Sequence, residues 1–223
     1  MMKSFDILST EQIIQSENLY LKNNPGANLV YNSALSILNF IDEKFNKKKI
    51  LFFCGPGNNG NDARKVFAIG SKKNTLKLLD IDNNKYQKEI DRCDIIVDAI
   101  FGFGLNRKLS DKISKLILEI NKSKKKIISI DIPTGILANT GKFLDIAIEA
   151  NITLVLGFFK PCHFLNPGKS KSGQLELLDL KYELPKNRIP NIKVLNSKLF
   201  DTKILKKKIN IHKYNNGSIL VIG

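Results

Sequence analysis

Short apolar runs alternate with amphipathic stretches along most of this chain. The runs are rich in β-branched residues and too short for helices, which predicts strands that are buried on both faces. The stretches between them repeat apolar residues at helical spacing, which predicts helices with one buried face. We therefore expect an α/β fold with helices on both faces of a mostly parallel sheet. The expected strands are residues 50–54, 76–79, 94–98, 126–130, 152–156 and 175–180, and the expected helices are residues 9–23, 29–47, 61–71, 85–90 and 110–121, with a helical turn at 145–149.

The pattern changes after Tyr182. Prolines and a run of lysines are typical of a linker, which we place at residues 183–210. The apolar run 218–223 that follows is typical of a strand. It is either the first strand of a second domain that stops short, or an edge strand that joins the main sheet. Residues 1–182 then form the principal domain.

Composition narrows the class of protein. With 43% hydrophobic residues, 223 residues support one sizeable core. No apolar run approaches the roughly 20 residues that cross a bilayer, and no signal-peptide core follows the start, so we expect a cytoplasmic protein without membrane contact. The net charge of +15 suggests polyanion binding, but only four of the 36 basic residues are arginine. We therefore expect no specific nucleic-acid partner. The cysteines lack paired or metal-ligand spacing, and we expect Cys54 and Cys93 to be buried.

Residues 55–60 form a G-x-G-x-x-G motif between a predicted strand and a predicted helix. Such glycines let the backbone approach an anion that the free amides at the helix start would bind. Asp80, at the end of the next predicted strand, completes the pattern of dinucleotide-binding proteins. The alternative is a simple tight turn. Asn58 and Asn59 add amide groups that a turn does not need, whereas Asp62 could serve only to complement the helix dipole.

Polar side chains also follow other predicted strands. Asp98 and Asp131 each end a buried strand, where a carboxylate is costly unless it is paired or binds a cation. Because parallel strands end at one edge of a sheet, we expect Asn59, Asp98 and Thr134 to lie close together. Their amide, carboxylate and hydroxyl oxygens suit a hard cation such as K⁺ or Mg²⁺. Asp131 would remain free as an acid or base, and Lys160 follows the next strand at the same edge.

Four segments in this order resemble the NAD(P)H-hydrate epimerases, the family of YjeF amino-terminal domains. The resemblance extends over about residues 9–180 and implies a Rossmann-like three-layer α/β/α sandwich with a mostly parallel sheet. It implies an isomerase that interconverts the R and S forms of NAD(P)H hydrate (NADHX and NADPHX) in nicotinamide nucleotide repair. It also implies a homodimer. The similar segments are residues 54–62, 97–104, 130–135, and 160–161 followed by 173–175.

The resemblance implies roles for particular residues. Asp131 would meet the nicotinamide end of the substrate and act as the catalytic acid and base. One K⁺ in each subunit would be held by Asn59, Asp98 and Thr134. The substrate would contact Asn58, Asn59, Gly60, Asn61, Asp62, Gly102, Phe103, Gly104, Leu105, Asn106, Arg107, Lys108, Asp131 and Lys160.

Two further features bear on this resemblance. Residues 211–223 resemble the beginning of a ribokinase-like NAD(P)H-hydrate dehydratase domain, but they are too few to hold its site. A separate dehydratase would then be the functional partner, or that activity has been lost. The chain departs from the family where Asn61 and Ala63 replace glycine and Thr134 replaces serine. Asparagine tolerates left-handed backbone and threonine keeps the hydroxyl, so we expect weakened rather than abolished binding.

Other functions remain open on sequence grounds. An NAD-dependent oxidoreductase would also use the glycine motif and Asp80, although no group that would assist hydride transfer is evident. A non-catalytic Rossmann-like module for dimerisation or RNA association would explain the charge but not Asp98 and Asp131. A degenerate remnant is the third alternative. His163 is either a base or an incidental loop residue.

Overall fold

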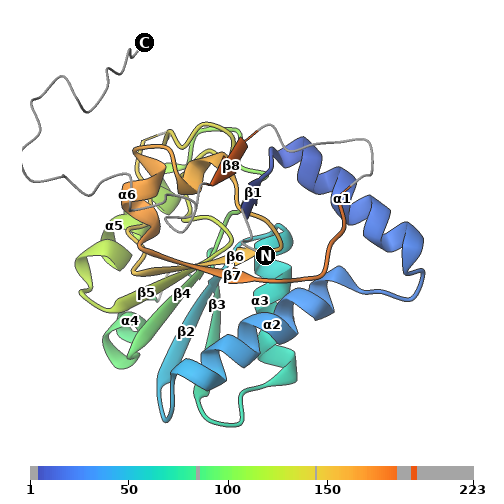
Figure 1. Ribbon diagram of the computed structural model, residues 1–223. Helices are drawn as coiled ribbons and strands as arrows, with labels where there is room; N and C mark the ends of the chain where they lie inside the picture. The colour runs from blue at the N-terminus through green and yellow to red at the C-terminus, as the bar shows by residue number, and fades with distance from the viewer. Residues whose placement is uncertain (1–4, 84–85, 144, 185–191, 195–223) are drawn as a thin grey trace, which may run out of the picture.

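Six parallel strands form the central sheet (Figure 1). The strands are β2 (Lys49–Cys54), β3 (Thr75–Asp80), β4 (Ile95–Ala99), β5 (Lys126–Ile130), β6 (Ile152–Leu156) and β7 (Gln174–Leu178). The computed structural model describes residues 5–83, 86–143, 145–184 and 192–194. The strand order is β3-β2-β4-β5-β6-β7, and every neighbouring pair is parallel. The predicted α/β fold is thereby confirmed.

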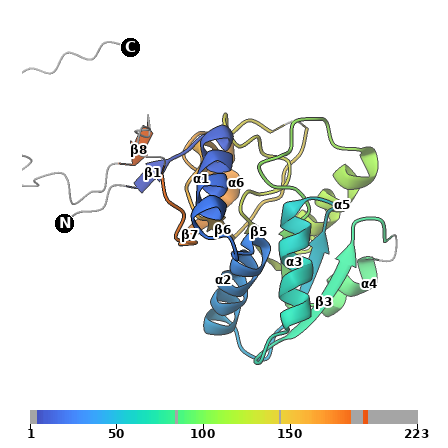
Figure 2. The same cartoon turned by 90° about the vertical axis from the view of Figure 1, so that its right-hand side faces the viewer.

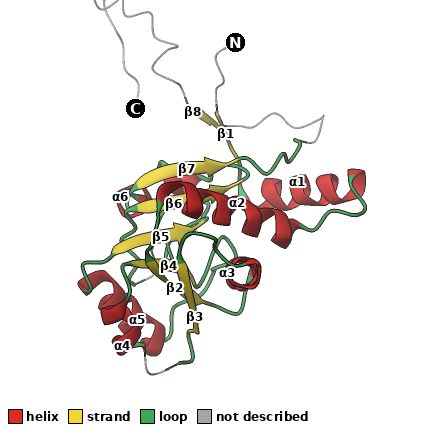
Figure 3. Cartoon of the chain, turned by 90° about the horizontal axis from the view of Figure 1, so that it is seen from below, coloured by secondary structure: helices red, strands yellow, loops and turns green. Residues whose placement is uncertain are grey.

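Helices cover both faces of this sheet. They are α1 (Thr10–Asn23), α2 (Leu29–Lys44), α3 (Asn58–Ile69), α4 (Gln87–Arg92), α5 (Asp111–Lys122) and α6 (Gly168–Ser172), with a short 3₁₀ helix, η1, at Pro161–His163. Successive strand residues point to opposite faces, so Phe52 packs in the core beneath α2 and α3, and Phe53 in the core beneath α4 and α5. Figure 3 shows these two helix pairs on opposite sides of the sheet. Because both faces are covered, the inner strands β2 and β4 are buried almost throughout, whereas the edge strands β3 and β7 carry exposed polar residues.

All six predicted strands are present, and most of the predicted helices agree to within two or three residues. Ser9 caps α1 as expected, with Gln12 completing a capping box. The predicted helical turn at 145–149 was wrong. That segment is irregular because the Ile148 amide donates to the Thr134 carbonyl oxygen (2.9 Å), and the Ile148 side chain is buried in the core beneath α5.

The chain reverses its direction across the sheet between β2 and β4. From β2 it passes through α3 to β3 on one side, and α4 then returns it past β2 to β4 on the other. At such a switch point the two connections leave in opposite directions and open a crevice outside the strand ends. The loops that bound this crevice are residues 55–57 after β2 and residues 100–110 after β4.

A separate two-stranded sheet lies beside the main one (Figure 2). It pairs β1 (Phe5–Ile7) antiparallel with β8 (Ile192–Val194), within the region predicted as a linker. The predicted start of a second domain at 211–223 lies outside the described residues, as does most of the linker. Within the part of the chain that is described, no helix combines the length and apolar character needed to cross a membrane.

Candidate active site

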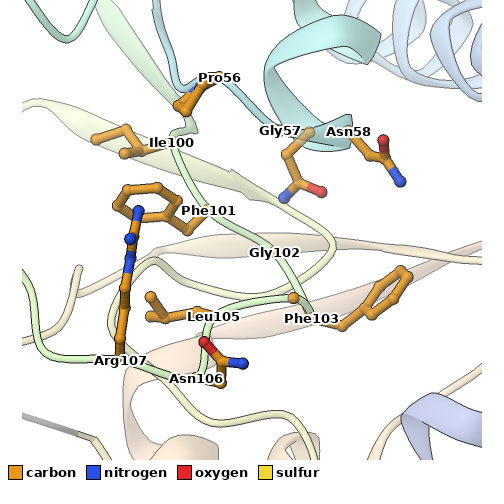
Figure 4. A pocket seen from close by; sticks show the side chains of 12 residues that line it. Pro56, Gly57, Asn58, Ile100, Phe101, Gly102, Phe103, Leu105, Asn106 and Arg107 are labelled. Atoms are coloured by element: carbon orange, nitrogen blue, oxygen red, sulfur yellow. The ribbon is translucent and has the colours of Figure 1, made fainter.

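Two adjoining cavities lie at the carboxyl-terminal edge of the sheet. The first has a volume of about 330 Å³ and lies between residues 56–59 and residues 100–107 (Figure 4). The second has a volume of about 230 Å³ and reaches from α3 to α1, α2 and the loops that follow β5 and β6. Both are lined by Asn58, Asn59 and Phe103. The two cavities are therefore neighbours that share these three residues.

The first cavity presents groups that suit an anion. Gly57 is the N-cap of α3 and offers no side chain to the first amides of that helix. These amides and the positive end of the helix dipole lie at the cavity wall. On the opposite loop, Arg107 adds a cation to the lining (Figure 4). This wall is suited to phosphate groups of a nucleotide.

The glycines of the G-x-G-x-x-G motif have a packing role as well. A Cβ added at Gly55 would lie 1.8 Å from the carbonyl oxygen of Ile100, and one at Gly60 would lie 1.9 Å from that of Gly55. Glycine is therefore required at position 55 so that the loops after β2 and β4 can approach each other, and at position 60 so that α3 can pack against the loop that precedes it. Arg64 reinforces the arrangement by donating to the Gly55 carbonyl oxygen (3.0 Å) and pairing with Asp80. The acidic residue of the dinucleotide pattern is thus already engaged by a neighbouring arginine.

Thr134 is hydrogen-bonded to Asp98, and Asn59 reaches the end of β5, where its side-chain amide contacts Ile130. The Thr134 hydroxyl is 2.6 Å from Asp98 Oδ1 and 3.3 Å from the Phe101 carbonyl oxygen. Its single proton serves only one of these two acceptors. Asn59 Nδ2 donates to the Ile130 carbonyl oxygen (2.7 Å), which leaves the amide oxygen of Asn59 as an acceptor.

The Asp98 carboxyl group is completely enclosed. Ser129 Oγ and the backbone amides of Thr134 and Ile100 also donate to it, at 2.8, 2.8 and 3.2 Å. Burial raises its pKa, and these hydrogen bonds act in the opposite direction. The described residues contain no group of three or more His, Cys, Asp or Glu side chains that could hold a metal. One carboxylate among neutral oxygens is a donor set that suits a hard cation of low charge.

Asp131 and Lys160 form a buried ion pair in the second cavity. Their side chains are 3% and 1% exposed, and Lys160 Nζ also donates to the Leu156 carbonyl oxygen (3.1 Å). The Leu156 amide donates to Asp131 Oδ1 (3.2 Å). Asp131 has a φ of 65°, a left-handed conformation that non-glycine residues seldom adopt and that is concentrated at functional sites. The backbone therefore holds this carboxylate in a fixed orientation at the cavity wall.

His163 holds the two ends of this ion pair together. The Lys160 amide donates to Nδ1 of His163 (3.1 Å), so the hydrogen is on Nε2, which donates to the Asp131 carbonyl oxygen (2.9 Å). The ring is buried, and burial together with the Lys160 charge lowers its pKa to about 4. The neutral ring thus contacts the backbone of both Lys160 and Asp131 through its two nitrogens and holds these residues in position.

This arrangement predicts acid sensitivity of the fold. Because the folded pKa of His163 is lowered, stability is fully present above pH 6.5 and is lost as the pH falls through about 4, by about 3 kcal/mol. We expect a His163→Leu variant to be less stable at neutral pH but to lose less stability on acidification. Urea unfolding across this range measures both free energies. Equal pH dependence in the two proteins would contradict the neutral histidine.

The remaining wall of the second cavity comes from both ends of the domain. Glu17 on α1 and Tyr182, which follows β7, line it together with Asp62. Ser16 Oγ donates to the Glu183 carbonyl oxygen (2.6 Å), and the rings of Tyr20 and Tyr182 lie 5.2 Å apart. Of these residues, only Asp62 was predicted from the sequence to belong to the site; Glu17 and Tyr182 were not. The only signal was an acidic residue, Glu17, on the apolar stripe of the first helix.

The predicted substrate-binding residues fall into three groups. Asn58, Asn59 and residues 102–107 line the first cavity, and Asp62, Asp131 and Lys160 line the second. The third group, Gly60, Asn61 and Lys108, lines neither cavity. Gly60 packs against Gly55, and Asn61 and Lys108 are exposed.

Ala63 does not disturb the site. Its methyl group is completely buried in the core beneath α2 and α3, and it lines neither cavity. The alanine that replaces a family glycine therefore adds apolar contact on the sheet side of α3. Similarly, Thr134 keeps the hydroxyl contacts to Asp98 and Phe101. Neither departure removes a group from the cavities.

Comparisons with known proteins agree with this architecture. The family described as YjeF-related protein N-terminus matches residues 65–162. An NAD(P)H-hydrate epimerase of Leuconostoc citreum is 32% identical over 182 residues, which are 71% of this chain and 82% of that protein. A bifunctional NAD(P)H-hydrate repair enzyme of Dictyoglomus turgidum is 32% identical over 87% of this chain but only 44% of its own length. The crystal structure of yeast YNL200c has the same fold, with a TM-score of 0.59 over 71% of this chain and 83% of that chain at 20% identity.

The parallel sheet with cavities at its switch point defines a Rossmann-like α/β protein. Within that class, the chain belongs to the family of YjeF-related N-terminal domains. The resemblance seen in the sequence is thereby confirmed. The chain spans about half the length of the bifunctional relatives that it matches.

Proposed function

We propose that the protein is an isomerase that interconverts the R and S epimers of NAD(P)H hydrate. The observation that carries this proposal is the buried Asp131–Lys160 pair, which faces a cavity directly beside one suited to phosphates. A relative of the same length class, 32% identical over most of both chains, is named NAD(P)H-hydrate epimerase. The site therefore supports recognition of a nucleotide at one end and proton transfer at the other.

The chemistry requires a proton donor and acceptor next to the nicotinamide ring. In the hydrate, C6 carries a hydroxyl group beside ring nitrogen N1. When that hydroxyl is protonated, the C6–O bond breaks, the N1 lone pair forms a C6=N1 double bond, and water leaves. Water then adds to either face of the planar C6, the C6=N1 pair returns to N1, and the new hydroxyl loses a proton. A ring-opening route gives the same exchange of faces.

Each part of the site has a role in this reaction. The amides of α3 and Arg107 would bind the phosphates in the first cavity, which directs the nicotinamide ring into the second. There Asp131 would act on the C6 hydroxyl or the added water as acid and base. Lys160 and the Leu156 amide hold its carboxylate in place. Burial of this pair excludes bulk water from the reacting carbon.

We include one K⁺ per subunit in this proposal. Its support is the set of oxygen atoms of Asn59, Asp98 and Thr134 at the strand ends, where the amide oxygen of Asn59 has no hydrogen-bond donor among the described residues. When bound there, K⁺ would supply positive charge beside the phosphate end of the substrate. The protein oxygens fit this ion because they are hard, mostly neutral donors.

Gly102→Ala is expected to weaken activation by K⁺. A Cβ at this position would lie 2.4 Å from Oδ1 of Asn59, so the amide would have to turn and leave the Ile130 carbonyl oxygen. We expect the K⁺ concentration for half-maximal rate to rise about tenfold, as for the loss of one hydrogen bond. The matched control is Gly104→Ala in the same loop, where an added Cβ meets nothing within 4 Å. An unchanged K⁺ requirement in Gly102→Ala would remove Asn59 from the ion site.

The oligomeric state, the compartment and the partner enzyme are inferred from the same family membership. We propose a homodimer that acts in the cytoplasm and whose product is used by a separate NAD(P)H-hydrate dehydratase. The support is the family of the chain, in which longer relatives are named bifunctional NAD(P)H-hydrate repair enzymes. Light scattering of the purified protein would measure the mass of the assembly against the 25.1 kDa of one chain.

The direct test is epimerisation of isolated R epimer. The purified chain would be mixed with R-NADHX or R-NADPHX in K⁺ buffer, and formation of the S epimer would be followed by chromatography. The spontaneous rate, measured without protein, would be subtracted. Acceleration by the folded protein is the expected result. A folded protein that leaves the spontaneous rate unchanged would overturn the proposal.

A further inference from the structure

Asp62 is a buried carboxyl group without a partner in the part of the chain that the structure describes. It lies in the second turn of α3, is 5% exposed, and lines the second cavity. Among the described residues, none donates a hydrogen bond to it or forms an ion pair with it. An ionised carboxylate in such a place would be costly. The carboxyl group is therefore held toward the cavity without a counterion of its own.

Two of the four ionisable groups that face Asp62 across the cavity are carboxyl groups. The four groups are Glu17 from α1, Asp131 from the loop after β5, Lys160 from the loop after β6, and Tyr182 from the segment after β7. The single cation of this group, Lys160, is paired with Asp131. Burial, and then the charges of Asp131 and Glu17, raise the pKa of Asp62 to about 8. At neutral pH this carboxyl group keeps its proton.

Two carboxyl groups with opposite protonation therefore line one cavity. Asp131 is a carboxylate that is held by an ammonium and a backbone amide, whereas Asp62 is a neutral acid. Such pairs define the acid and the base in enzymes that carry out both proton transfers at neutral pH. A reaction in which water leaves one face of a ring and adds to the other requires both.

We propose that Asp62 is the catalytic acid of the epimerisation, the partner of Asp131 as catalytic base. This inference rests on the proposed function and deepens it. Asp62 gives its proton to the C6 hydroxyl oxygen, the C6–O bond breaks, and the N1 lone pair forms the C6=N1 double bond as water departs. A second water then adds to the opposite face of C6, the π electrons return to N1, and Asp131 accepts the proton.

The proton balance makes the two residues exchange roles. After one conversion Asp62 is ionised and Asp131 is protonated, which is the state that catalyses the reverse conversion. Exchange with water restores the starting state. No oxidant or reductant is needed, because C6 has the same oxidation state in both epimers. A pair of carboxyl groups that can exchange roles is suited to the interconversion of R and S epimers, which runs in both directions.

A structural role at the helix start would look different. Asp111 occupies the first turn of α5, where it is exposed and complements the helix dipole. Asp62 lies further along its helix, buried, and faces a cavity. The pair therefore supplies a matched control, since Asp111→Asn removes an acidic group from a helix start without touching either cavity.

Epimerase activity distinguishes a catalytic role of Asp62 from a structural one. Asp62→Asn is expected to lower kcat for the R epimer by about a hundredfold or more while KM changes little, and Asp111→Asn is expected to leave both unchanged. The wild-type rate is expected to decline as the pH rises through about 8, where Asp62 loses its proton. This decline is expected to move to lower pH in Glu17→Gln and to be absent from the residual rate of Asp62→Asn.

Thermal unfolding without substrate tests the protonation of Asp62 independently of catalysis. The melting temperatures of wild type and Asp62→Asn would be compared from about pH 5 to about pH 9. The difference is expected to change in favour of the variant as the pH rises, because only the wild type must bury an ionising carboxyl group. If the difference in melting temperature between the two proteins stays constant across this pH range, Asp62 is not a neutral acid in the folded protein. If Asp62→Asn has the same kcat as the wild type, the catalytic role of Asp62 is overturned and the proposed function stands. If the wild-type protein is itself inactive, the proposed function is overturned together with the role of Asp62.

Discussion

Replacement of Asp131 by asparagine is expected to slow epimerisation by about a thousandfold, within the range typical for loss of a positioned acid or base. Asparagine is the suitable replacement because Asp131 has a φ of 65°, a conformation that asparagine tolerates best among residues with a side chain. The amide oxygen can still accept from the Leu156 amide, so the loop geometry is preserved. What disappears is the ability to exchange a proton at the nicotinamide end of the site.

The comparison must separate chemistry from folding. Asp131→Asn leaves the Lys160 ammonium without its carboxylate, so some loss of stability accompanies the loss of rate. Circular dichroism at the assay temperature establishes that the variant is folded. The control is Asp82→Asn, which removes an exposed carboxylate at the far end of a surface pair with Lys112. Near-normal turnover by folded Asp131→Asn would exclude Asp131 from proton transfer.

Lys160→Met is expected to have the largest effect on stability, a loss of about 3–5 kcal/mol. The methionine fills a similar volume but leaves the carboxylate of Asp131 buried without a counterion. Urea unfolding measures the free-energy change. Lys171→Met is the matched control, because Lys171 pairs with Glu149 at the surface (2.6 Å), where such pairs contribute about 1 kcal/mol or less.

A double variant tests the physical cause. Combining Lys160→Met with Asp131→Asn removes both charges, so the double variant is expected to be more stable than Lys160→Met alone. The two changes are coupled through one contact, and their effects are not additive. If the losses simply add, the ion pair is not what stabilises this loop, and the packing of the lysine stem is responsible instead.

The sheet could be predicted from the sequence because its inner strands are buried on both faces. That burial makes β2 and β4 apolar runs, and residues such as Phe52 and Phe53 show the two cores that require it. The contact of Thr134 with Asp98, and of Asn59 with the end of β5, follows from one rule, that parallel strands end at a common edge. Their proposed roles as ion ligands remain predictions.

The second cavity could not be predicted in the same way. Glu17, Tyr182 and His163 come from segments that no local pattern links to the strand ends. Lys160 stood out only by its position among many lysines. The protonation of Asp62 depends on how completely three other elements enclose it, and sequence spacing carries no information about enclosure. Burial and pairing decide these properties, and both arise from tertiary structure.

The hydrogen bond from Ser16 to Glu183 has a consequence for biosynthesis. It joins residues 167 positions apart, and Tyr20 and Tyr182 meet beside it. On the ribosome, the first helix is therefore made long before the segment that completes its cavity. Catalytic competence would be acquired as the last event of folding, after the sheet has formed, because contacts of such long range form slowly. Until then, the acidic side chains that will line the cavity are still in contact with water.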